Sequence, residues 1–175
     1  SYLCFNFRNP RLADMRVRRA IARAIDIGAV LKYRIGGFGY PSTGILAPSH
    51  ADHYEPGVER HAFDPRLAER LLDEAGYPRK GAGGWRFELV FKTTTEKFGN
   101  EMARIISNDL RKIGIDVRLH AVEPGTFFAD VGAGAFDLFH SRWVGVTNPS
   151  IYFRAFHSSQ LPAQGGVNRG SYSNP

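Results

Sequence analysis

The sequence has little of what marks most enzymes, metalloproteins and membrane proteins. Cys4 is its single cysteine, which excludes an internal disulfide and a thiolate metal cluster. No apolar run approaches the roughly 20 residues that a membrane-spanning helix needs. The first residues carry neither the basic region nor the cleavage site of a signal peptide. With 43% hydrophobic residues among 175, the composition suits one ordinary globular domain, in an oxidising or a reducing compartment.

Catalytic and metal-binding motifs are also scarce. The histidines never form an H-E-x-x-H motif, and the chain has neither a G-x-S-x-G elbow nor a P-loop. His50 and His53 have the spacing of two metal ligands, but they lie in an expected loop with no obvious third ligand. Asp73 and Glu74 fall on the outer face of an expected helix, where contact with water is a sufficient reason for a pair of carboxylates. We therefore expect a protein that is not an enzyme and that uses no metal or cofactor.

The net charge of +6 comes from the first forty residues. That segment has eight lysines and arginines against two aspartates, whereas residues 41–175 have fifteen charges of each sign. A local basic patch can bind nucleic acid or another anionic surface. Arg16, Arg19 and Arg23, however, are expected on one helix face without the aromatic residues of a nucleic-acid surface. A solvated helix face is the simpler interpretation, and steeply salt-dependent DNA binding would support the alternative.

Apolar periodicity and capping residues predict that helices and strands alternate along the chain. The predicted helices are 14–25, 26–35, 64–75, 98–113, 125–131 and 149–157; the predicted strands are 85–91, 115–122 and 136–143. Residues 36–56 are rich in Gly, Pro, Ser and His and are expected to form a long loop that is functional or packed against another part. The order strand, helix, strand over 85–122 predicts two parallel strands joined by a right-handed crossover. The predicted fold class is α/β.

The first predicted strand alternates apolar and charged residues. Trp85, Phe87, Leu89 and Phe91 are expected on a buried face. Arg86, Glu88 and Lys92 lie between them and are expected to face solvent.

Four phrases of the sequence resemble one family, the bacterial extracellular solute-binding proteins of family 5. These are the peptide- and nickel-type substrate-binding proteins of ABC importers. The phrases are "FNFRNPRLADMRVRRAIARAID", "FDPRLAERLLDEAGYP", "ISNDLRKIGIDVRL" and "FDLFHSRWVGVTNPSIYF". Their order and spacing match the family's pattern over essentially all 175 residues.

The resemblance implies a periplasmic-binding-protein-like lobe of type II, with a mixed, mainly parallel sheet flanked by helices. Residues 1–175 would form the C-terminal ligand-binding lobe of a longer two-lobe protein, entered from a hinge near residues 2–7. Such a protein captures a small solute, peptide-like or other, between its lobes and delivers it to the permease subunits of an ABC importer. The implied protein is periplasmic or otherwise extracytoplasmic, with or without a membrane anchor. It is a monomer with no nucleic-acid partner. The alternative is a related sensor domain that signals when its lobes close on a ligand.

Trp143 is the leading candidate for contact with a ligand. In open α/β sheets, ligands bind outside the carboxyl ends of the strands, and Trp143 ends a predicted strand. Its indole can therefore line the cleft, the alternative being that it packs under the following helix. The candidate ligand-binding residues are Phe38, Tyr40, His140, Arg142, Trp143, Gly145, Val146, Thr147 and Asn148.

Val146 stands where the family's peptide-binding members usually carry an aspartate that holds the α-ammonium group of the ligand. A buried ammonium group without a carboxylate is costly. His140 and Arg142 lie just before the same turn. These residues favour an anionic or neutral ligand over a peptide with a free N-terminus.

Overall fold

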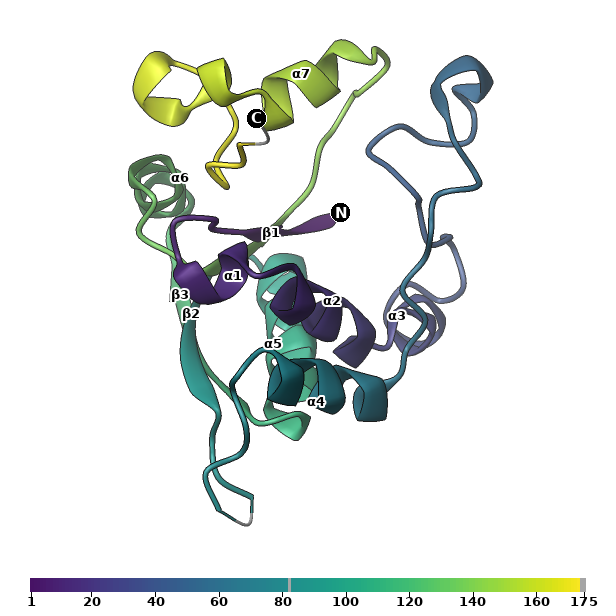
Figure 1. The fold of residues 1–175 in the computed structure, drawn as a ribbon. Helices are drawn as coiled ribbons and strands as arrows, with labels where there is room; N and C mark the ends of the chain where they lie inside the picture. Colours follow the sequence, from purple (N-terminus) through teal and green to yellow (C-terminus); the bar gives the residue numbers. More distant parts are fainter. Residues whose placement is uncertain (82, 174–175) are drawn as a thin grey trace.

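The computed structural model describes residues 1–81 and 83–173 (Figure 1). The strands are β1 (Tyr2–Phe5), β2 (Phe87–Thr94), β3 (Ile115–Val122) and β4 (Leu138–Ser141). The α-helices are α1 (Pro10–Ala13), α2 (Met15–Ala24), α3 (Ile27–Ala29), α4 (Pro65–Glu74), α5 (Lys97–Lys112), α6 (Pro124–Ala133) and α7 (Ser150–Phe156). A π-helical turn, η1 (Val30–Arg34), continues α3, and short 3-10 turns occupy η2 (Ala51–His53), η3 (Ser158–Gln160) and η4 (Pro162–Gln164).

The four strands form one mixed sheet in the order β1-β4-β2-β3. β2 pairs in parallel with both β3 and β4, whereas β1 pairs antiparallel with β4. The α/β fold class and the parallel pairing of the two strands that flank α5 are therefore confirmed. β1 has no counterpart among the strands predicted from periodicity. Its four residues are too few to show an alternation, and its partner lies more than 130 positions away.

Helices cover both faces of the sheet (Figure 1). On one face, Ile21 of α2, Leu72 of α4 and Leu110 of α5 are fully buried in the main core with the inner side chains of β2 and β3. On the other face, α6 contributes Phe127, whose ring meets that of Phe139 on β4 edge to face at 5.8 Å. The carboxyl ends of β2 and β4 are therefore flanked by helices on both sides.

Local capping explains where the helices begin and end. The Asp14 carboxylate accepts a hydrogen bond from the Arg16 amide (2.8 Å) at the start of α2. Asp64 accepts one from the Leu67 amide (2.9 Å) at the start of α4. Gly114 follows α5 with a φ of 87°, a left-handed conformation that glycine adopts without strain. These features agree with the predicted boundaries of the three helices to within one or two residues.

The prediction for residues 85 and 86 is wrong. β2 starts at Phe87, and Trp85 lies before it with 47% of its surface exposed. Arg86 is buried, because its guanidinium joins the ends of two helices. Its Nε donates to the Ile113 carbonyl (2.9 Å) and its Nη1 to the Tyr77 carbonyl (2.7 Å). Nη1 also pairs with the Asp73 carboxylate. Asp73 therefore has a partner within the protein in addition to water.

The long loop between η1 and α4 extends at one side of the molecule (Figure 1). Its Leu46 is fully buried, and its Ile45 amide donates to the Tyr152 hydroxyl of α7 (3.2 Å). The expectation that this loop packs against another part of the chain is thereby confirmed. His50 and His53 belong to the loop's 3-10 turn. Among the residues described, no three His, Cys, Asp or Glu side chains are grouped as metal ligands, and none of the helices has the length and apolarity to span a bilayer.

Candidate functional site

A large hollow in the described part of the chain runs along β1, and we call it the edge cavity. Its volume is about 830 Å³, within the range of about 300–1,000 Å³ usual for small-molecule sites. β1, α2 and the segment 167–172 form most of its wall. The aromatic side chains in that wall are Tyr2, Phe5, Phe7, Phe139, Trp143, Phe156 and Tyr172.

Trp143 lies in the wall of the edge cavity, two residues beyond the end of β4. Its indole stacks on the Tyr2 ring, with centroids 5.7 Å apart and planes inclined by 14°. The Arg169 guanidinium lies 5.9 Å from the centroid of the same indole. The side chain is only half-buried. Trp143 therefore lines the edge cavity, and its contact with a ligand stays a prediction.

The outer wall of the edge cavity is fixed by a buried asparagine. Asn168 Nδ2 donates to the carbonyls of Tyr172 (2.8 Å), His157 (3.2 Å) and Phe156 (3.3 Å). Its Oδ1 accepts from the Tyr172 amide (3.0 Å). The Phe7 amide donates to the Gly170 carbonyl (2.8 Å), which ties this segment to the end of β1. Sequence reasoning missed Asn168, since one asparagine in an irregular segment belongs to no recognisable pattern.

A second, smaller hollow lies at the carboxyl ends of β2 and β4, and we call it the strand-end hollow. Its volume is about 240 Å³. The first turns of α5 and α6 contribute to its wall. The lining residues are Thr94, Glu96, Phe98, Gly99, Pro124, Phe127, Phe128, His140, Ser141, Arg142 and Val144. Two of the predicted ligand-binding residues, His140 and Arg142, therefore lie here rather than in the edge cavity.

His140 is a buried polar group in the wall of the strand-end hollow. Only 8% of its surface is exposed, and its Nε2 has no hydrogen-bond partner among the described residues. Burial lowers the pKa of this imidazole to about 4, with the positive charges of the N-terminus and Arg142 adding to the effect. His140 is consequently neutral at pH 7, so one of its ring nitrogens donates a hydrogen bond and the other accepts one.

The other predicted residues lie outside both hollows. Gly145, Val146, Thr147 and Asn148 form the turn that leads into α7, and the Asn148 side chain accepts from the Ser150 amide (2.8 Å). Phe38 and Tyr40 lie in the long loop, 88% and 55% exposed. The structure thus brings together Trp143, His140 and Arg142 at the end of β4. The remaining six residues lie on the surrounding surface, and their contact with a ligand stays a prediction.

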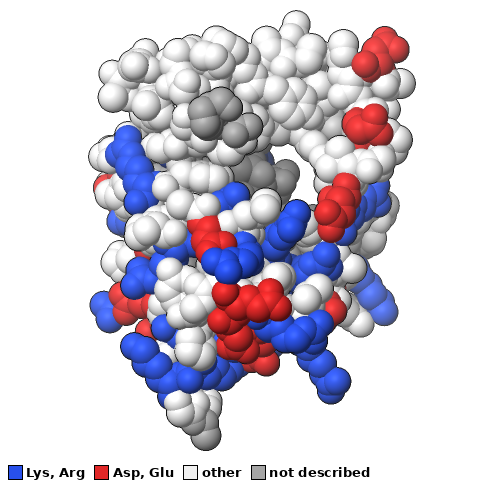
Figure 2. Space-filling view, in the orientation of Figure 1, with Lys and Arg blue, Asp and Glu red and all other residues white. Residues whose placement is uncertain are grey.

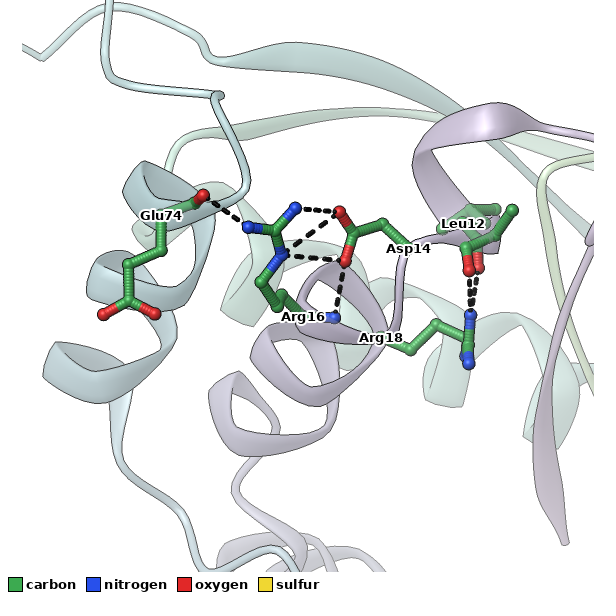
Figure 3. Close-up of polar contacts among 6 residues, drawn as sticks. Leu12, Asp14, Arg16, Arg18 and Glu74 are labelled. Atoms are coloured by element: carbon green, nitrogen blue, oxygen red, sulfur yellow. Dashed lines mark hydrogen bonds and ion pairs between the residues drawn. The ribbon is translucent and has the colours of Figure 1, made fainter.

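Two arginines of α2, Arg16 and Arg18, have partners within the protein (Figure 3). Arg16 pairs with the Asp14 carboxylate and donates to the Glu74 carbonyl at the end of α4 (2.7 Å). Arg18 donates to the Leu12 carbonyl at the end of α1 (2.8 Å). Figure 2 shows lysine and arginine side chains mixed with acidic ones over the lower part of the molecule. This surface is not the uniform basic patch that nucleic acid requires.

A mixed sheet flanked by helices, with one hollow along its edge strand and another at its strand ends, is an arrangement typical of ligand-binding α/β domains. The family described as "Bacterial extracellular solute-binding proteins, family 5 Middle" matches residues 1–163. The chain belongs to this family, as the four sequence phrases indicated. Its members are binding proteins and not enzymes.

Individual relatives support the same assignment. The di/tripeptide-binding protein 2 of Pseudomonas aeruginosa is 30% identical over 171 residues, which are 97% of this chain and 31% of the relative. The structure of the oligopeptide-binding protein AppA from Bacillus subtilis, in complex with a nonapeptide, has a TM-score of 0.87. It is 26% identical and covers 99% of this chain and 36% of its own.

A nickel-binding relative has almost the same fold. NikZ from Campylobacter jejuni, in complex with Ni(L-His), has a TM-score of 0.85 and is 26% identical over 98% of this chain and 36% of its own. The chain thus spans about a third of the length of the relatives it matches.

Proposed function

We propose that this chain is the C-terminal ligand-binding lobe of a two-lobe substrate-binding protein of an ABC importer. The protein captures a small solute between its lobes outside the cytoplasm and delivers it to the permease. Lobe closure around the bound solute is the conformational step. The proposal assigns the ligand to the class that the relatives' names span: small peptides, their derivatives or a metal complex.

The placement of Trp143 carries this proposal. Its half-buried indole lies just beyond the carboxyl end of β4 and lines the edge cavity together with Arg169, whose guanidinium is 5.9 Å from the ring centroid. An indole offers a ligand a large apolar face and one N–H donor. Neighbouring apolar side chains are also open to solvent: Val144 is 82% exposed, Phe128 53% and Phe156 45%. Apolar surface of this kind suits a partner lobe and an enclosed ligand.

The test is identification of the solute that the two-lobe protein retains during purification. The protein is denatured after extensive washing, and the released small molecules are identified by mass spectrometry. Trp143→Ala is expected to reduce the retained amount by about tenfold or more, the loss of about 1.4 kcal/mol of contact energy. Trp85→Ala is the control, because Trp85 lies at the opposite end of the sheet, before β2.

A second measurement uses the 175-residue chain alone. Because half of the contacts are missing, it is expected to bind the identified solute at least about a hundredfold more weakly than the two-lobe protein does. The chain has two tryptophans, so Trp85→Phe leaves the fluorescence of Trp143 as the only indole signal. Retention of no solute, or equal retention by Trp143→Ala, would overturn the proposed function. Equally tight binding by the single chain would overturn the two-lobe cleft.

A further inference from the structure

Arg169 is a half-buried cation in the wall of the edge cavity. None of the ion pairs in the described part of the chain includes it. Its guanidinium lies instead near aromatic rings, 5.9 Å from the centroid of Trp143 and 5.6 Å from that of Phe128 on α6. A cation within about 6 Å of a ring centroid is attracted by the negative face of the ring, most strongly by that of tryptophan. Aromatic faces thus take the place that a carboxylate often has beside a half-buried arginine.

The Trp143 indole has few other restraints. Residues 143–147 make no backbone–backbone hydrogen bond within the described chain. The next residue, Val144, is 82% exposed, and a Cβ atom at Gly145 would meet no other atom within 4 Å. The Tyr2 ring is the stacking partner of the indole. The orientation of the Trp143 ring therefore depends on Tyr2 and Arg169 rather than on its own segment.

The backbone that carries Arg169 is held in place on both sides. The preceding residue, Asn168, is fixed by the hydrogen bonds described above. At Gly170 a Cβ atom would lie 2.6 Å from the Phe5 carbonyl oxygen, so this segment packs against β1 more closely than a side chain would allow. Ser171 has a φ of 55°, a left-handed conformation that residues other than glycine seldom adopt and that persists only where the surroundings hold it. The guanidinium of Arg169 therefore starts from a fixed point beside β1.

Arg169 also links separate elements of the lobe. Phe128 belongs to α6 and lines the strand-end hollow, whereas Trp143 follows β4 and lines the edge cavity. On β1, burial raises the pKa of the Tyr2 phenol, and the positive charge of Arg169 acts against that rise. One side chain thus lies close to aromatic residues of β1, α6 and the segment after β4.

We propose that Arg169 is a positioning residue that fixes the Trp143 indole in the wall of the edge cavity. The inference rests on the proposed function, in which this indole contacts the solute. Arg169 acts on binding through the indole and is not itself the contact. The attraction is present before a solute arrives, so less freedom of the ring is lost on binding and the affinity is higher.

The first measurement is time-resolved fluorescence anisotropy of this chain carrying Trp85→Phe, in which Trp143 is the only indole. Arg169→Met keeps an unbranched side chain but removes the charge. The sub-nanosecond component of the anisotropy decay should gain amplitude, because an unrestrained side chain reorients in picoseconds to nanoseconds. Arg169→Lys keeps the charge and should show a smaller gain. Arg154→Met, at an exposed arginine of α7, is the control and should leave the decay unchanged.

The second measurement is solute retention by the two-lobe protein. Arg169→Met should lower the retained amount by about two- to fivefold, the effect of losing one cation–π contact. In the Trp143→Ala background the same substitution should cause no further loss, because a residue that acts through the indole has nothing left to position. Far-ultraviolet circular dichroism of every variant checks that it is folded.

Three results would contradict the proposal. They are an unchanged anisotropy decay in Arg169→Met, a sub-nanosecond component as large in Arg169→Lys as in Arg169→Met, and a further loss of retention in the double variant. The last result would make Arg169 a direct ligand contact. The anisotropy measurement needs neither a solute nor a second lobe, so it separates this inference from the proposed function.

Discussion

Replacing Arg86 by methionine should cost this fold a large part of its stability. The guanidinium lies among the ends of α4, α5 and the start of β2, with 3% of its side chain exposed. Methionine keeps most of the volume but removes the donors to the Ile113 and Tyr77 carbonyls. At about 1–3 kcal/mol for each buried acceptor left without a partner, the expected loss is about 2–6 kcal/mol. Typical domains have only about 5–15 kcal/mol in total.

Urea denaturation followed by far-ultraviolet circular dichroism measures this loss. The matched variant is Asp73→Ala, which removes the ionic partner of Arg86. Because the Asp73 side chain is 52% exposed, its removal should cost only about 0–1 kcal/mol. Equal losses in the two variants would show that the ion pair, and not the two carbonyls, accounts for the role of Arg86. A loss below about 1 kcal/mol for Arg86→Met would refute the reasoning altogether.

Three further predictions concern the site and the backbone. The folded pKa of His140, about 4, lies below its ordinary 6.5, so the unfolded chain binds this proton first. The free energy of unfolding should therefore fall by up to about 3 kcal/mol as pH drops from 6.5 to about 4, and urea denaturation of His140→Phe should lack this part of the loss. Peptides with free N-termini should bind the two-lobe protein no better than acetylated ones, whereas Val146→Asp should restore a preference of about tenfold in calorimetry. Gly114→Ala should destabilise by about 1–2 kcal/mol because φ is 87° there, while Gly132→Ala, on an exposed and open turn of α6, should stabilise by about 0.5–1 kcal/mol in thermal melts.

Elements that depend on local signals were predictable from the sequence. Asp64, Pro65 and Gly76 mark the limits of α4 through capping and proline geometry, which act within one helical turn. The parallel pairing of β2 with β3 follows from the length of α5 between them. The antiparallel pairing of β1 with β4 was out of reach, because no short-range pattern connects residues so distant in the sequence.

Arg86 shows why the period of a strand can mislead. Its charge and its place between apolar residues predict a solvent-facing side chain, yet it lies beside two helix ends whose carbonyls need donors. Only the tertiary arrangement reveals that need. The candidate site was predictable to the same limited extent. Strand-end reasoning found Trp143, but it had no means of finding Tyr2, Asn168 or Tyr172, which reach the edge cavity from both ends of the chain.

Among the described residues, buried polar groups have hydrogen-bond partners at the amino end of the sheet and lack them at the carboxyl end. This contrast supports placing the function at the carboxyl end. At the amino end, buried Arg86 has carbonyl and carboxylate partners. At the carboxyl end, Thr93 and His140 are as deeply buried and have none among the described residues. The Ser107 hydroxyl is also unpartnered, but it lies inside α5, where a serine has the carbonyl four residues earlier as a local acceptor. The two strand residues have no such local acceptor, so burial of these polar atoms costs free energy at the carboxyl end of the sheet, whereas Arg86 is satisfied at the amino end.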